Sequence, residues 1–123
     1  MARILVVDDE VEILVMLREM LEEAGYEVVD AHNGKVALKL HREDPADLII
    51  MDIFMPEKDG IETIKELMAE FPETKLITIS GGGDRQWDPE PYLEMVAKLG
   101  AKRTFFKPVR KDELLEAVRE LLK

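Results

Sequence analysis

Short apolar runs alternate with longer amphipathic stretches along this chain, five of each, and this alternation constrains the fold more than any other feature. The apolar runs are rich in β-branched residues, which is typical of strands, whereas the longer stretches carry apolar residues at helical spacing. Such an order predicts β-α units around a parallel sheet, which is an α/β fold. The expected strands are 4–7, 27–31, 48–51, 75–80 and 104–106, and the expected helices are 11–24, 35–43, 61–71, 92–99 and 110–122.

Length and charge exclude several classes of protein. The 123 residues, of which 46% are hydrophobic, predict a single domain over residues 1–123 with one real core. The formal net charge of −10 opposes binding to nucleic acid or to an anionic membrane surface. The chain contains no Cys, which excludes disulfides, thiolate nucleophiles and Cys-ligated metals. Apolar runs of four or five residues are too short to span a membrane, no signal peptide is recognisable, and we expect a cytoplasmic protein.

Acidic residues follow the first and the third expected strand. Asp8 and Asp9 come directly after the first strand, and Asp52 comes directly after the third. In a doubly wound sheet of strand order 2-1-3-4-5, ligands bind beyond the carboxyl ends of these two strands. Two carboxylates about 4 Å apart repel each other by about 4 kcal/mol at an effective dielectric constant of about 20, so the cluster needs a cation. Oxygen ligands without His or Cys suit Mg²⁺ or Mn²⁺.

A hydroxyl group and an amine are expected at the same edge of the sheet, because Ser80 and Lys107 end the fourth and fifth strands. Carboxylates, a metal ion, a hydroxyl and an amine together describe a site for phosphoryl transfer, in which an Asp serves as the nucleophile. Alternatives exist for the single residues. Asp9 with Glu12 fits a helix capping box, and Ser80 and Lys107 taken singly fit surface positions. Their coincidence at four strand ends favours the site.

Four motifs occur in a characteristic order along the chain: Val6-Val7-Asp8-Asp9-Glu10; Met51-Asp52 with Met55-Pro56 and Asp59-Gly60; Ser80 after an apolar strand; and Lys107-Pro108. This ordered set, which spans the whole chain, resembles the receiver domain of two-component response regulators, in particular the stand-alone type found in chemotaxis. The resemblance implies a flavodoxin-like fold, with a five-stranded parallel sheet of order 2-1-3-4-5 and five flanking helices.

The resemblance also implies a function in phosphorelay signal transduction. Asp52 would accept a phosphoryl group, as an aspartyl phosphate, from a phosphohistidine of a histidine kinase or a histidine phosphotransfer protein. The phosphorylated chain would then switch its binding to a downstream protein target. Such a receiver is a signalling protein rather than an enzyme, since it catalyses only its own phosphotransfer and autodephosphorylation.

Individual roles follow from the same resemblance. Asp8, Asp9 and Asp52 would hold Mg²⁺, with the backbone carbonyl of Phe54 as a further ligand. Lys107 would contact the phosphoryl oxygens. The remaining two implied features are a Ser80 hydroxyl that moves toward the phosphoryl group on activation and a cis peptide bond between Lys107 and Pro108.

The chain departs from the family pattern at two places. Thr104 stands where many receivers carry an aromatic residue that rotates inward on activation, and we expect the neighbouring Phe105 to face the opposite side and join the core. The connection from Gly81 to Pro91, which begins with Gly81, Gly82 and Gly83, is unusually long. It is interpreted as a mobile lid beside Ser80 or, alternatively, as a tolerated surface insertion.

Some side chains are expected to lie on the surface. His32 and His41 are expected to be solvated. The first helix carries two apolar stripes, Val11-Leu14-Leu17-Leu21 and Ile13-Met16-Met20, which is more than one core face requires. The excess would dock the helical bundle of a kinase or phosphotransfer protein, and burial against the sheet is the competing interpretation.

Three other functions were weighed. The chain fits a receiver cut from a longer regulator with an output domain. A phosphohydrolase of the haloacid dehalogenase type would need a second Asp two residues after Asp52, where Phe54 stands instead. A receiver that binds partners without phosphorylation would not need the family's chemical residues, all of which are present.

Overall fold

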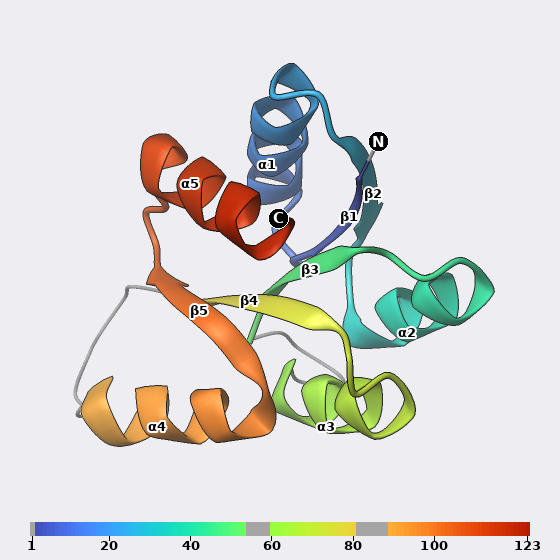
Figure 1. Cartoon of the computed structure of the whole chain (residues 1–123), viewed down its shortest axis with the longest axis vertical. Coiled ribbons are helices and arrows are strands. Elements are labelled where there is room, and N and C mark those ends of the chain that lie inside the picture. Colours follow the sequence, from blue (N-terminus) through green and yellow to red (C-terminus); the bar gives the residue numbers. More distant parts are fainter. Residues whose placement is uncertain (1, 54–59, 81–88) are drawn as a thin grey trace.

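The computed structural model describes residues 2–53, 60–80 and 89–123 of the chain. Strands and helices alternate throughout, as the sequence predicts (Figure 1). The strands are β1 (Arg3–Val7), β2 (Glu27–Ala31), β3 (Leu48–Asp52), β4 (Lys75–Ser80) and β5 (Ala101–Phe106). The helices are α1 (Val11–Glu23), α2 (Gly34–Glu43), α3 (Gly60–Glu70), α4 (Pro89–Leu99) and α5 (Lys111–Leu121).

The five strands form one parallel sheet in the order β2-β1-β3-β4-β5. Helices α1 and α5 cover one face of this sheet, and α2, α3 and α4 cover the other (Figure 1). The predicted α/β class, the strand order and the five flanking helices are therefore confirmed, which is the flavodoxin-like arrangement. No helix among the described residues is both long and apolar enough to cross a membrane.

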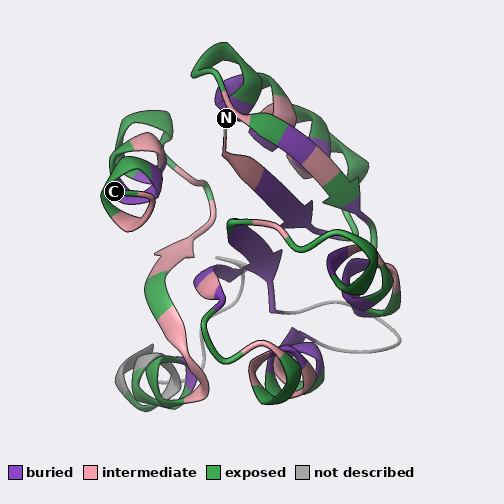
Figure 2. Cartoon of the chain, turned by 45° about the vertical axis from the view of Figure 1, so that its right-hand side comes forward, coloured by how far each residue is buried: buried purple, intermediate pink, exposed green. Residues whose placement is uncertain are grey.

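The two central strands are buried on both faces (Figure 2). Alternate residues of β1 and β3 enter two separate cores: Ile4, Val6, Leu48 and Ile50 face α1 and α5, whereas Leu5, Val7, Ile49 and Met51 face α2 and α3. A strand covered on both faces needs apolar side chains in both directions, which explains the uninterrupted apolar runs. Because β1 and β3 pair in parallel, with Val7 opposite Met51, the residues that follow them emerge at the same edge.

Two boundaries differ by three residues from the sequence prediction, and the others agree within one residue. Helix α4 begins at Pro89 rather than at residue 92, since Pro fits the first turn of a helix, where its missing N–H would have no partner within the helix. Strand β5 begins at Ala101 rather than at residue 104. Its first residues include the exposed Lys102 and Arg103, and only the pairing of Ala101 and Arg103 with β4, across an irregularity at Lys102, makes this segment a strand. The proposed lid, including Gly81, Gly82 and Gly83, lies almost entirely outside the described residues.

Candidate functional site

The predicted acidic cluster forms at the carboxyl ends of β1 and β3. Asp8 directly follows β1 and Asp52 ends β3, and both side chains are buried, whereas Asp9 is exposed at the rim. A carboxylate oxygen from each of Asp8, Asp9, Glu10 and Asp52 lies within 4.8 Å of the others. Glu10 is not among the site residues that the sequence predicts. The sequence feature that could have identified it is its position as the third consecutive acidic residue before a helix.

Asp8 is held by the backbone around it. Its N–H donates to the carbonyl oxygen of Ala31 at 3.2 Å, and its Oδ1 accepts from the N–H of Glu10 at 2.9 Å. Glu10 is the N-cap residue of α1, and no side-chain hydrogen bond caps this helix among the described residues. The alternative interpretation of Asp9 and Glu12 as a capping box is therefore wrong, because the helix begins one residue later than that motif requires.

Lys107 lies across the cluster. Its Nζ is 3.2 Å from Asp52 Oδ2, 3.1 Å from Asp8 Oδ2 and 2.9 Å from Glu10 Oε1. The residue directly follows β5, and its N–H donates to the carbonyl oxygen of Ser80 at 2.9 Å. Burial lowers the pKa of the Lys107 amine, but the hydrogen bond to Glu10 and the charges of Asp52 and Asp8 outweigh burial, so the pKa is raised. The amine is therefore charged at every physiological pH.

Asp8 carries the feature that points to a cation. Burial raises the pKa of its carboxyl group, against the hydrogen bond from Glu10 and the attraction of Lys107. Its Oδ2 is buried and lies near the Lys107 ammonium, yet it accepts no hydrogen bond from the described residues. A buried carboxylate oxygen with open lone pairs beside three more carboxylates is a donor set that fits a hard divalent cation.

Ser80 ends β4 and is completely buried at the same edge of the sheet. In the pairing register, Asp52 lies opposite Ile79, so Ser80 follows one residue farther along the neighbouring strand. The cis peptide bond between Lys107 and Pro108 is present, as the resemblance implied. Phe54, expected to supply a backbone carbonyl, lies outside the described residues.

Thr104, which stands where many receivers carry a rotating aromatic residue, pairs its hydroxyl group with that of Thr78. Thr104 Oγ1 lies 2.8 Å from Thr78 Oγ1 on the neighbouring strand, two residues before Ser80. Phe105 points to the other face of β5 and packs, partly buried, against the core under α1 and α5. The expectation that Phe105 faces the opposite side is confirmed. Thr104 thus links β5 to β4 through a polar side-chain contact.

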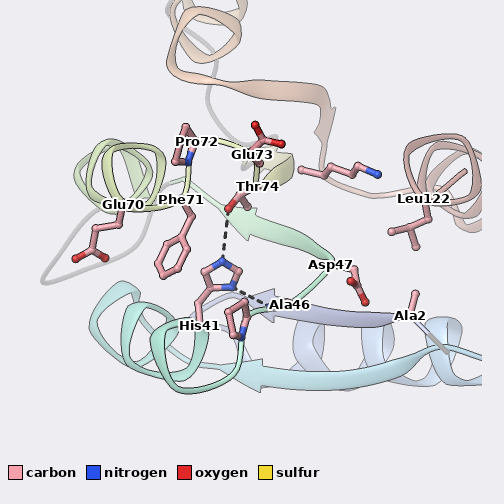
Figure 3. A pocket seen from close by; sticks show the side chains of 12 residues that line it. Ala2, His41, Ala46, Asp47, Glu70, Phe71, Pro72, Glu73, Thr74 and Leu122 are labelled. Carbon is pink, nitrogen blue, oxygen red and sulfur yellow. Dashed lines mark hydrogen bonds between the residues drawn. The ribbon is translucent and has the colours of Figure 1, made fainter.

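His41 is not solvated as expected. Its ring is 2% exposed and lines a cavity of about 780 Å³ at the edge of the sheet opposite the acidic cluster. Nδ1 accepts from the N–H of Ala46 at 3.1 Å, and Nε2 faces Thr74 Oγ1 at 3.5 Å (Figure 3). Phe71 packs edge-on against the ring. The available signal was helical spacing, since His41 follows the buried Ala37 by four residues.

The apolar excess on α1 is smaller than predicted. Ile13 and Met16, from the second stripe, pack partly buried against the core. Val11 and Val15 remain 70% and 49% exposed, one helical turn apart. They line a surface cavity of about 470 Å³ next to the acidic cluster. The exposed apolar surface of the described part of α1 is therefore this pair of valines rather than a whole second stripe.

Comparison with known proteins places this arrangement in a family. The model of the response regulator receiver domain matches residues 4–119. The chemotaxis protein CheY of Thermotoga maritima is 37% identical over 122 residues, which are 98% of each chain. The transcriptional regulatory protein CpxR of Escherichia coli is also 37% identical, over 123 residues that are 100% of this chain and 50% of CpxR. A crystal structure of the response regulator TrrA of Thermotoga maritima, in complex with Mg(2+)-BeF, superposes with a TM-score of 0.85 at 37% identity and covers 99% of this chain and 100% of TrrA. The chain belongs to the family of response regulator receiver domains.

Proposed function

We propose that Asp52 of this chain accepts a phosphoryl group from a phosphohistidine, and that residues 1–123 act as one receiver domain in a phosphorelay. One observation carries the proposal: the buried Asp52 carboxylate lies 3.2 Å from the Lys107 ammonium within a cluster of four carboxylates. In the transfer, an Asp52 oxygen attacks phosphorus and forms a P–O bond. The P–N bond of the phosphohistidine breaks, and its electron pair returns to the imidazole nitrogen.

The family supports this reading. Receiver domains are signalling proteins for which phosphoryl acceptance is characteristic, and they act with histidine kinases and downstream targets. They generally depend on Mg²⁺. In this chain Asp8, Asp9 and Asp52 would hold the ion together with the Phe54 carbonyl. When bound, Mg²⁺ or Mn²⁺ supplies a positive charge that neutralises the phosphoryl oxygens.

Lys107 and Ser80 complete the chemistry. The Lys107 ammonium, always charged, neutralises a phosphoryl oxygen as it approaches Asp52. The Ser80 hydroxyl, at the end of β4, donates to another phosphoryl oxygen and so couples phosphorylation to β4 and to the Thr78–Thr104 contact beside it. In autodephosphorylation, water attacks phosphorus, the P–O bond to Asp52 breaks, and inorganic phosphate leaves. No other substrate is required.

The partner surface lies beside the site. Val11 and Val15 form an exposed apolar pair on α1, and the residues around them include Arg18 and Glu19. A kinase or phosphotransfer protein presents its phosphohistidine on a helix, and such a helix would pack against this pair while the histidine reaches Asp52. Phosphorylation then changes the binding of a downstream protein.

Intact-mass spectrometry after incubation with acetyl phosphate and Mg²⁺ tests the proposal. We expect the wild-type chain to gain one phosphoryl group and Asp52→Asn to gain none, because the amide cannot form the acyl phosphate. Asp112→Asn is the matched control, since Asp112 is exposed on α5, and this variant should gain one group like the wild type. Phosphorylation of Asp52→Asn, or wild-type phosphorylation that persists in excess chelator, would contradict the proposal.

A further inference from the structure

Lys107 has one partner that the proposed chemistry does not use. Its ammonium donates hydrogen bonds to Glu10 Oε1 at 2.9 Å and to Asp52 Oδ2 at 3.2 Å, and it faces Asp8 Oδ2 at 3.1 Å. An ammonium group has three protons to donate. Two of these protons are donated to Glu10 and Asp52, and Asp8 Oδ2 lies close to the ammonium without a hydrogen bond, so a phosphoryl oxygen that approaches Lys107 competes with the carboxylates that already surround it.

Glu10 is the partner that Lys107 loses most readily. The side chains of Asp8 and Asp52 are 1% and 3% exposed, whereas that of Glu10 is 55% exposed and is rehydrated as soon as it leaves. The backbone of Glu10 stays in place, since its N–H binds Asp8 and its carbonyl oxygen accepts from Ile13 and Leu14 at the start of α1. Only a side-chain rotation is needed to free Lys107.

The charge of Glu10 acts on both ligands of the site. The cluster holds four carboxylates, and three of them lie within 3.2 Å of the Lys107 ammonium. A fourth negative charge attracts a divalent cation and repels an incoming phosphoryl anion. The contact between Glu10 and Lys107 adds to the second effect, because it holds the ammonium in competition with the anion.

We propose that Glu10 is a positioning residue that competes with the phosphoryl group for Lys107, so that it weakens anion binding at Asp52 while it strengthens cation binding. This inference rests on the proposed function of Asp52. It assigns to Glu10 the control of how readily the site accepts and keeps a phosphoryl group. Glu10 itself touches neither the phosphorus nor the nucleophile.

The test uses Glu10→Gln, which keeps the shape of the side chain and removes its charge. Calorimetric titration with Mg²⁺, and then with beryllofluoride as the phosphoryl analogue at saturating Mg²⁺, gives two dissociation constants. We expect Mg²⁺ to bind about two- to fivefold more weakly and beryllofluoride about two- to fivefold more tightly, the range that an exposed ion pair allows. Because the two affinities are expected to change in opposite directions, competition can be distinguished from damage to the fold, which would weaken the binding of both Mg²⁺ and beryllofluoride.

Glu12→Gln is the matched control, since it removes the same charge from an exposed position in the first turn of α1. It should leave beryllofluoride binding as in the wild type. In a Lys107→Met background, Glu10→Gln should tighten beryllofluoride binding less than it does when Lys107 is present, because only the charge repulsion remains and the group for which Glu10 competes is gone.

Three results would overturn the inference alone: both constants moving in the same direction, an equal effect of Glu12→Gln, or tightening that is equally large without Lys107. A different result would overturn the proposed function as well. In that case the wild-type chain itself would bind no beryllofluoride and gain no phosphoryl group from acetyl phosphate.

Discussion

At the scale of single residues, Lys107 and His41 have pKa values shifted for different reasons. Lys107 gains charged partners that hold it as a cation where charge is needed. His41 gains none, and burial lowers the pKa of its ring. The neutral ring accepts from Ala46 through Nδ1, so its proton is on Nε2, which faces Thr74. A second proton would remove the acceptor for Ala46 and bury a charge.

The pH dependence of stability follows from this environment of His41. Its pKa is lowered in the folded chain, so between its ordinary value of about 6.5 and the lower folded value the unfolded chain binds more protons. The stability due to neutral His41 is therefore fully present above about pH 6.5 and is lost as the pH falls through the folded pKa. The steepest loss that one proton allows is about 1.4 kcal/mol per pH unit.

Urea unfolding between pH 7.5 and pH 5 measures this loss. We expect the difference in free energy of unfolding between wild type and His41→Gln to shrink as the pH falls, since Gln does not titrate. His32→Gln, which removes an exposed histidine, is measured beside it as the matched control. A difference between wild type and His41→Gln that is constant across this range would contradict the assignment.

At the scale of elements, the packing of α2 on α3 depends on the absence of one side chain. Gly34, the first residue of α2, is buried, and a Cβ atom there would overlap the hydroxyl group of Thr63 on α3. Thr63 is itself completely buried, so it has little room to move. The two helices approach each other so closely at this point that neither a larger residue at position 34 nor a shift of Thr63 is accommodated.

Gly34→Ala should therefore destabilise the chain by about 1–3 kcal/mol through overpacking, although Ala normally favours a helix over Gly by about 1 kcal/mol. The free energy of unfolding in urea measures the effect. Gly34→Ala combined with Thr63→Ala should cost less than the sum of the two single changes, since the overlapping hydroxyl is absent. Lys35→Ala, an exposed change in the same turn, should stay within about 0.5 kcal/mol of the wild type. Additive costs of the two changes would contradict this account.

The sequence predicts the central elements best and the outer ones least. The strands β1 and β3 are buried on both faces, so each is an uninterrupted apolar run that can be recognised from its own sequence. Strand β5 carries the exposed Lys102 and Arg103, and its start is defined only by pairing with β4. His41 misleads for a related reason, since its burial depends on Phe71 and Thr74, which lie about 30 residues later in the chain between α3 and β4.

At the scale of the whole molecule, the site has an unfavourable charge distribution. The chain has a net charge of −10, and the buried Asp8 stands in a group of four carboxylates beside one ammonium. Mutual repulsion and burial both oppose folding of such a cluster. A functional site of this kind reduces stability until its ligand is bound.

Mg²⁺ should therefore raise the melting temperature, by an amount equivalent to about 2.7 kcal/mol when the ion is at about 100 times its dissociation constant. Differential scanning calorimetry at constant ionic strength, with Mg²⁺ or with chelator, measures this effect. In chelator, Asp8→Asn should unfold at a higher temperature than the wild type, by about 0.5–2 kcal/mol in stability, because one buried charge is gone. The same variant should lose most of the response to Mg²⁺. An unchanged response in Asp8→Asn would contradict the assignment of Asp8 as a ligand.

The sequence by itself determined the central strands, the parallel α/β class and the edge at which Asp8, Asp52, Ser80 and Lys107 meet, while the strand order came from its resemblance to receiver domains. These follow from local hydrophobic patterns and from the rule that parallel strands end together. Only the tertiary structure decided which atoms share the Lys107 ammonium, and that Glu10 is among them. It also decided that His41 is buried. Such contacts join residues far apart in the chain, and their distances depend on side-chain packing, which no local pattern records.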